Sequence, residues 1–208
     1  MRCLIVSKTH MNKGNRVCVG GFDLDTGSNV RLLTHNAENQ PDTTPFSIGQ
    51  IWDLRVIKRS RCIPPHVEDV LVQSSSIAGN QPQMRAFIEG NCPIVAGPLA
   101  STFDGRLRFT SGGSGYIVQS SGLPSGSVCF WRPSVALARR DYDDKIKYEF
   151  TQNLIQRRRI GWVGLQPPLP VIPAGTLLRL SLARWWKPRD APASEEEKCF
   201  LQISGYFR

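Results

Sequence analysis

Short apolar segments, each followed within a few residues by Gly, Asn, Asp or Pro, recur along the whole sequence. They are rich in Val, Ile and Leu, and their lengths are typical of β-strands rather than of helices. The segments are 2–8, 15–24, 29–34, 50–59, 127–132, 145–150, 159–165, 175–185 and 198–207. Only residues 83–91, with Gly90 as an expected capping residue, and the turn from Gln152 to Arg158 favour helix. The sequence therefore predicts an all-β protein with one or two short helices.

A weak internal repeat relates the two halves of the chain. Gly49 aligns with Gly175, and the strands that follow then match at Ile51/Leu177, Leu54/Leu180, Val56/Leu182 and Lys58/Arg184. In each half a basic loop containing Pro, an acidic cluster and another apolar strand come next. This repeat predicts two linked small barrels of about five strands each. We expect the first barrel in residues 1–92, a Gly/Ser-rich connection with a hairpin in 93–126, and the second barrel in 127–208.

The chain is strongly basic, with 26 Lys and Arg against 17 Asp and Glu, a formal net charge of +9. Such an excess favours polyanionic partners, because a basic face attracts phosphates and gains free energy from releasing their counterions. The sequence has no signal-peptide core and no apolar run near the roughly 18 residues of a membrane span, so we expect a cytoplasmic protein without a membrane partner. Its six cysteines are scattered singly, which favours reduced core residues over disulfides or a zinc site.

Signatures of catalysis are scarce. The sequence has neither GxxxxGK[ST] nor GxGxxG, and GGSGY lacks the spacing of a nucleophile elbow. None of its three histidines is paired with another. We therefore predict no catalytic residue, no cofactor and no metal.

Two fragments keep alternatives open. His66-Val67-Glu68-Asp69 is similar to the H-x-E of zinc deaminases but has no P-C-x-x-C partner, so we interpret it as a loop whose carboxylates pair with cations such as Arg59 or Arg61. Asp143-Asp144-Lys145 is compatible with a metal-dependent nuclease, in which a carboxylate holds magnesium and the lysine orients water. Such a site needs a further carboxylate, for which Asp104 is the candidate.

Cations interleaved with aromatic residues recur instead. Single-strand binding uses such a surface, because a basic groove follows the backbone while rings stack on the bases. Trp52, Trp131 and Trp162 lie within apolar strands and are expected in the core. Neighbouring side chains of a strand face opposite sides, so Trp185 and Trp186 cannot both face one core, and one of them should be exposed. The predicted nucleic-acid contacts are Arg31, Lys58, Arg59, Arg61, Arg157, Arg158, Arg159, Arg184, Trp185, Trp186, Lys187 and Arg189.

The order of the strands and loops resembles the dual OB-containing domain family of bacterial proteins. The segments that carry the resemblance are LIVSK, CVGGFDLDTG, NVRLL, GQIWDLRVIKR, PPHVEDV, LRLSLARWW and CFLQISGYF. Where the family's third strand usually reads W-I-R-P, this chain has Asn29-Val30-Arg31-Leu32, which keeps only the arginine. The resemblance implies two OB-type barrels packed as one unit, no established enzymatic activity, binding of nucleic acid or nucleotides, and a role in bacterial defence systems.

Taken together, the residues predict a non-enzymatic protein that binds single-stranded or distorted DNA or RNA by electrostatic capture followed by stacking. Three alternatives stay open. In the first, Trp185 and Trp186 form a hot spot for a protein partner of the same defence system. In the second, Asp143 and Lys145 serve a metal-dependent nuclease. In the third, an OB barrel holds one nucleotide in a pocket.

Overall fold

The computed structural model describes residues 1–11, 15–142, 145–152 and 155–208. The chain is mainly β, with one short α-helix, α1 (Met84–Asn91), and three 3₁₀ turns at Leu99–Ser101, Phe103–Gly105 and Gln119–Ser121. The strands of the first half are β1 (Arg2–His10), β2 (Arg16–Asp23), β3 (Ser28–Leu33), β4 (Gln40–Pro41), β5 (Gln50–Lys58) and β6 (Asp69–Asn80). Those of the second are β7 (Ile94–Ala96), β8 (Arg108–Phe109), β9 (Gly115–Ile117), β10 (Val128–Arg132), β11 (Leu137–Tyr142), β12 (Lys145–Gln152), β13 (Gln156–Trp162), β14 (Val171–Ile172), β15 (Leu177–Leu182) and β16 (Cys199–Phe207).

The first half forms a closed five-stranded barrel. Its strands pair in the order β1-β2-β3-β6-β5, and β5 returns to β1. All these pairings are antiparallel except β3 with β6, which run parallel. A five-stranded Greek-key barrel of this kind is an OB fold. Its interior holds Cys3, Ile5, Val17, Val19, Val30, Leu32, Phe46, Trp52, Leu54 and Val70.

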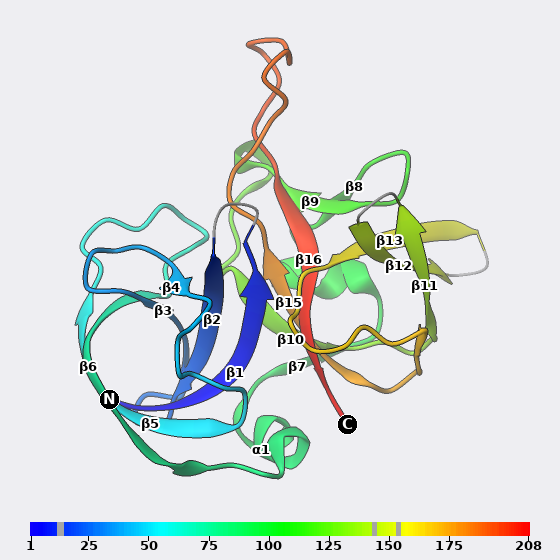
Figure 1. Ribbon diagram of the computed structural model, residues 1–208. Coiled ribbons are helices and arrows are strands. Elements are labelled where there is room, and N and C mark those ends of the chain that lie inside the picture. The colour runs from blue at the N-terminus through cyan, green and yellow to red at the C-terminus, as the bar shows by residue number, and fades with distance from the viewer. Residues whose placement is uncertain (12–14, 143–144, 153–154) are drawn as a thin grey trace.

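The second half repeats this strand order with its first strand broken in two. β10 pairs with β15 and β11 pairs with β12, and only residues 133–136 separate β10 from β11. Pro133 follows β10 directly, and a proline has no N–H with which to continue a ladder. β13 pairs with β16 in parallel, as β3 does with β6. The expectation of two OB-like units in a mostly β chain is therefore confirmed (Figure 1).

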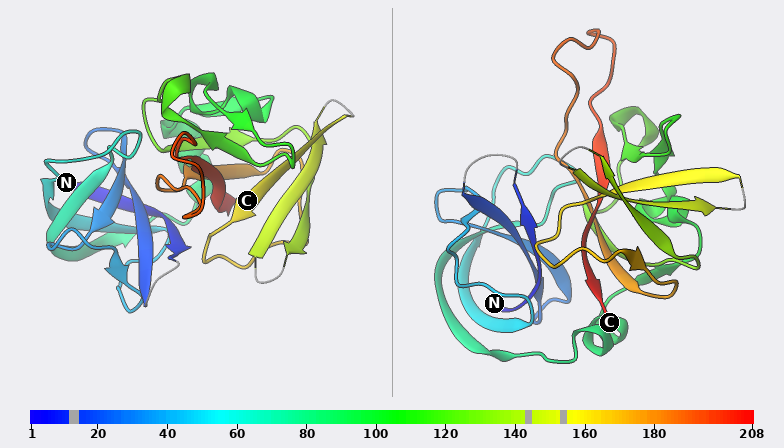
Figure 2. Two further views of the ribbon diagram at one scale, coloured as in Figure 1. Left: turned by 90° about the horizontal axis from the view of Figure 1, so that it is seen from above. Right: turned by 45° about the vertical axis from the view of Figure 1, so that its right-hand side comes forward.

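A third apolar cluster lies between the two barrels. It combines β1 and β2 residues with residues of β10, β15 and β16, and α1 closes it from below in Figure 1. Its buried members are Leu4, Val6, Phe22, Ile88, Cys92, Phe130, Leu177 and Phe207. The barrels stand side by side in both further views (Figure 2), and this shared core joins them.

The structure places the two aligned segments of the repeat at equivalent positions. Gly49 and Gly175 precede β5 and β15, which are the fourth strands of their barrels, and both adopt positive φ, 90° and 78°. Ile51 and Leu177 pack in the cluster between the barrels. The pairs Leu54/Leu180 and Val56/Leu182 pack in the interior of their own barrels.

The helical expectations need two corrections. α1 covers most of residues 83–91, but Gly90 lies inside the helix and does not cap it. The C-cap is Cys92, which has an extended conformation. From Gln156 on, the chain expected as a second helical turn is strand β13, because it extends the sheet beside β12. Within 93–126 the expected hairpin is β8 with β9. The division of the chain at 92 and 126 stays a prediction.

The core contains the residue types expected of it. Trp52, Trp131 and Trp162 are buried, and all six cysteines are free. Only Cys3, Cys92 and Cys199 are buried, whereas Cys18, Cys62 and Cys129 are half-buried, so the expectation of core cysteines is met for three of the six. Trp131 and Trp162 belong to the second interior, with Leu178, Leu180 and Leu182 among their neighbours. In the described part of the chain no helix is long and apolar enough to cross a membrane.

Candidate nucleic-acid interface

Three arginines from separate elements converge on one buried carboxylate, Asp69. Asp69 begins β6, and its parallel partner across the sheet is Arg31 of β3. Arg31 Nη2 donates a hydrogen bond to Asp69 Oδ2 over 2.6 Å, and Arg59 Nη1, just after β5, donates to the same oxygen over 2.9 Å. Arg184 Nη2 reaches it from the second barrel over 3.3 Å. The Asp69 side chain is only 1% exposed, so the cluster joins both barrels with more positive than negative charge.

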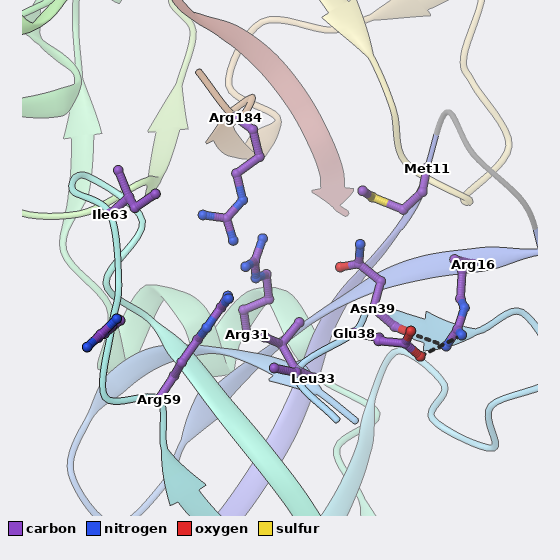
Figure 3. Close-up of a pocket in the computed structure, with 11 residues that line it drawn as sticks. Met11, Arg16, Arg31, Leu33, Glu38, Asn39, Arg59, Ile63 and Arg184 are labelled. Atoms are coloured by element: carbon purple, nitrogen blue, oxygen red, sulfur yellow. Dashed lines mark hydrogen bonds and ion pairs between the residues drawn. The ribbon is translucent and has the colours of Figure 1, made fainter. Parts of the chain in front are cut away.

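These three arginines line a hollow of about 710 Å³, which we term the basic hollow. Figure 3 shows Arg31, Arg59 and Arg184 pointing toward one another at its centre. Arg16 and Arg61 line it as well, and Arg16 Nη2 donates to Glu38 Oε2 over 2.7 Å. The remaining lining is Met11, Leu33, Ala37, Asn39 and Ile63. Five arginines against Glu38 and the underlying Asp69 give this hollow an excess of positive charge, which attracts anions.

The two adjacent tryptophans have different roles. Trp185 packs against the second interior, and its Nε1 donates a hydrogen bond to the Pro64 carbonyl of the first half over 2.9 Å. Trp186 is 55% exposed, and its ring lies 6.2 Å from that of Phe200 between centroids. One indole is therefore exposed, as expected, and it is Trp186.

The three arginines of β13 form a different group on the second barrel. Arg157 Nη2 and Arg159 Nε donate to the carboxylate of Glu149 on β12, and Arg158 stacks over Phe109 at 3.9 Å from the ring centroid. Burial by itself raises the pKa of Glu149, but hydrogen bonds from Tyr142, Arg157 and Arg159 outweigh it and hold the pKa at about 2. None of these three arginines is among the described residues that line the basic hollow.

The remaining predicted contacts are spread over the surface. Lys58 is exposed at the end of β5, and Arg61 lines the basic hollow. Lys187 Nζ donates to the Glu195 carbonyl, and Arg189 is exposed in the same β15–β16 connection, which projects away from both barrels in Figure 1. The structure thus brings Arg31, Arg59, Arg61 and Arg184 together around the basic hollow, with Trp185 and Trp186 in the wall of a neighbouring cavity that Arg31 and Arg184 also line. Lys58, Arg157, Arg158, Arg159, Lys187 and Arg189 line neither.

Of the residues weighed for metal chemistry, His66, Glu68 and Asp104 have structural partners. His66 is buried, with its Nε2 3.1 Å from the Leu182 carbonyl, and the Glu68 carboxylate accepts from the Ser127 hydroxyl over 2.9 Å. The expected pairing of a carboxylate with Arg59 is the Asp69 contact, whereas Arg61 takes no part in it. The Asp104 carboxylate accepts from the Ser125 N–H over 2.7 Å. Asp143 lies outside the described residues, among which no three metal-ligating side chains gather.

The topology and the shared core define a protein of two OB barrels packed into one body. The chain belongs to the Dual OB-containing domain family, whose match covers residues 1–206. No curated protein matches the chain in sequence.

Three solved structures are similar to the chain at low identity. One, described as "Structural mimicry for functional antagonism", is 12% identical at a TM-score of 0.36, covering 99% of this chain and 91% of the other. The Ifi202 HINa domain in complex with 20bp dsDNA is 11% identical at a TM-score of 0.36, covering 100% and 96%. A murine DNA binding protein bound with ds DNA is 10% identical at a TM-score of 0.33, covering 98% and 91%. TM-scores of this size do not transfer any property of these proteins to this chain.

Proposed function

We propose that the chain is a non-enzymatic protein that binds nucleic acid through the basic hollow. The observation that carries this proposal is the convergence of Arg31, Arg59 and Arg184 over one buried carboxylate. Asp69 fixes the three guanidinium groups in place, so little side-chain entropy is lost when a phosphate binds them. Because a single carboxylate cannot neutralise three cations, the cluster keeps an attraction for a phosphate backbone.

Single-stranded or distorted DNA or RNA is the preferred form in this proposal. Arg31 and Arg184 also line a neighbouring cavity whose wall includes the exposed Trp186. A base that leaves the duplex stack can lie on such an indole, a contact worth about 1–3 kcal/mol. A protein partner that contacts Trp186 is the alternative outcome of the experiment below.

The test measures fluorescence anisotropy of labelled single-stranded and duplex DNA and RNA across a salt series. We expect affinity to fall steeply with salt, and Arg61→Gln to reduce the slope of log K against log salt by about 0.7–0.9, the share of one phosphate contact. Trp186→Ala should weaken single strands more than duplexes. Arg55→Gln is the matched control, because Arg55 is exposed on β5 and lies outside the basic hollow.

Three results would contradict the proposal. Binding that hardly changes between low and physiological salt would exclude electrostatic capture. Equal losses from Arg61→Gln and Arg55→Gln would show that overall charge, not the basic hollow, attracts the strand. If no oligonucleotide binds at all, Trp186 is better explained as a contact for another protein.

A further inference from the structure

A second cavity, of about 500 Å³, lies between the two barrels, and we term it the interbarrel cavity. Residues of β1, β2 and β3 line one side, and residues of β10, β15 and β16 line the other. It adjoins the basic hollow through Met11, Arg31 and Arg184, which line both. Its volume lies within the range of about 300–1,000 Å³ that is usual for small-molecule sites.

Arg179, in the middle of β15, lines this cavity and is only 4% exposed. Its Nη1 donates to the Ser204 hydroxyl over 3.0 Å, whereas its buried Nε has no hydrogen-bond partner among the residues that the structure describes. Among the described residues no carboxylate lies within 4.0 Å of this guanidinium. A methyl group added at Gly20 would lie 2.8 Å from Arg179 Nη2, so the guanidinium reaches across from the second barrel to the backbone of the first.

An isolated buried cation is costly, since the desolvation of an ion amounts to several kcal/mol unless a counter-charge compensates it. The charges around the cavity compensate it only in part. Glu68 is the one carboxylate among the described residues that line the cavity; it attracts Arg179 and also accepts hydrogen bonds from the backbone N–H and hydroxyl of Ser127. Arg31, Lys145 and Arg184 line the cavity beside Arg179, so four cations face one carboxylate. The lining therefore fits an anionic ligand, which would complete the environment of Arg179.

The rest of the lining suits a sugar and a base. His66 Nε2 donates to the Leu182 carbonyl, so Nδ1 of the neutral ring is an acceptor. Nδ1 is buried, and within the described part of the chain it has no hydrogen-bond partner. Burial lowers the pKa of His66, which keeps the ring neutral. Ser7, Thr9 and Ser181 also line the cavity and carry hydroxyl groups, and Trp185, Trp186 and Phe200 add aromatic surface.

We propose that the interbarrel cavity binds one mononucleotide unit, with its phosphate on Arg179 and its base against the Trp186 and Phe200 rings. The acceptor of His66 and the hydroxyl groups then bind the sugar or the edge of the base. The unit is either a free nucleotide or the phosphorylated end of a strand. The two sites share Arg31 and Arg184, and both proposals use Trp186; Arg61, which lines only the basic hollow, and Arg179, which lines only the interbarrel cavity, distinguish them.

The experiment titrates the whole protein with AMP, GMP, CMP and UMP, with the matching nucleosides and with inorganic phosphate, by calorimetry. We expect at least one mononucleotide to bind about tenfold or more tightly than its nucleoside or phosphate alone, because both the charge and the ring contribute. In a parallel anisotropy assay, a single strand with a 5′- or 3′-phosphate is compared with the same strand lacking it. Preference for the phosphorylated end would identify the strand terminus as the source.

Variants separate this site from the basic hollow. Arg179→Met should abolish mononucleotide binding while keeping the fold, since an unbranched apolar chain of similar length replaces an uncompensated charge. Ser181→Leu adds apolar bulk inside the cavity at a half-buried position. It should block the ligand while Arg179 itself is kept. Arg61→Gln, outside this cavity, should leave mononucleotide binding unchanged while it weakens strand binding.

The proposal is wrong if no mononucleotide binds and terminal phosphates make no difference. It is also wrong if folded Arg179→Met and Ser181→Leu proteins bind nucleotides as the wild type does. Loss of mononucleotide binding in both variants, with strand binding through Arg61 retained, would support the interbarrel cavity as its own site.

Discussion

Gly20 of β2 occupies a position where no side chain fits. An added Cβ would lie 2.4 Å from the Ser7 hydroxyl and 2.8 Å from Arg179 Nη2, so one of these groups would have to move. We expect Gly20→Ala to lower the free energy of unfolding by about 1–3 kcal/mol, measured by urea denaturation. Gly79→Ala is the control, since a Cβ there has open space, and it should change stability little. Equal midpoints for the two variants would refute the close approach.

Arg179 shows which part of the site the sequence could not predict. Alternation along β15 puts Leu178, Leu180 and Leu182 toward the second interior and leaves Arg179 on the opposite face of the strand. From the sequence alone, an arginine at such a position is predicted to be exposed to solvent. That face is buried only because the first barrel packs on it, and no local sequence pattern indicates such a tertiary contact.

The excess of cations near Trp186 could be predicted from the sequence. The convergence of arginines on Asp69 could not, because it depends on the parallel pairing of β3 with β6.

The β12–β13 hairpin depends on a charged group of side chains around Glu149. We expect Glu149→Gln to destabilise the protein by about 2–3 kcal/mol near pH 7, because it removes the negative charge and one of the two oxygens that accept from Arg157 and Arg159. The folded pKa of about 2 lies below the ordinary 4.5, so this stabilisation is complete above pH 4.5 and is lost as pH falls through about 2. Urea denaturation of both proteins between pH 7 and pH 2 measures it.

Glu38→Gln is the control for this hairpin, because Glu38 also pairs with an arginine but its side chain is 55% exposed. Exposed pairs contribute only about 0–1 kcal/mol, so this variant should change stability little at any pH. A difference between wild type and Glu149→Gln that stays constant from pH 7 to pH 2 would show that the charge of Glu149 is not what stabilises β12 and β13.

Strands with continuous apolar patterns were predictable, and those defined by long-range pairing were not. The alignment of Gly49 with Gly175 correctly predicted which residues of β5 and β15 are equivalent. In both strands the first matched residue packs in the cluster between the barrels, and the next two pack in the interior of their own barrel. The far half of β6 is different. Ser74, Ser75 and Ser76 are exposed and carry no hydrophobic period, and they are strand because β5 pairs with them. The break between β10 and β11, in contrast, has a local signal, because Pro133 follows β10 directly.

The two barrels are joined by three kinds of contact. The apolar cluster around Ile88 and Phe130 is buried between them. The end of β1 is hydrogen-bonded to the backbone of the second half: His10 N–H donates to the Val163 carbonyl, and Leu165 N–H donates to the Lys8 carbonyl, both over 2.9 Å. Arg184 reaches Asp69 across the same junction. Both proposed sites lie along this junction, so their geometry depends on the barrels folding together.

Ile88 of α1 tests whether the two barrels fold as one cooperative unit. Its side chain is fully buried in the cluster that both barrels share, so Ile88→Ala should cost about 2–5 kcal/mol by leaving a cavity. Differential scanning calorimetry should show a single transition for wild type and variant, shifted to lower temperature in the variant, because neither barrel keeps its buried face without the other. Ile155→Ala, at a position 88% exposed, is the matched control and should leave the transition in place. Two separate transitions, with only one of them shifted by Ile88→Ala, would mean that the barrels unfold independently. Ligand binding at the junction would then have to fix the arrangement of the two barrels.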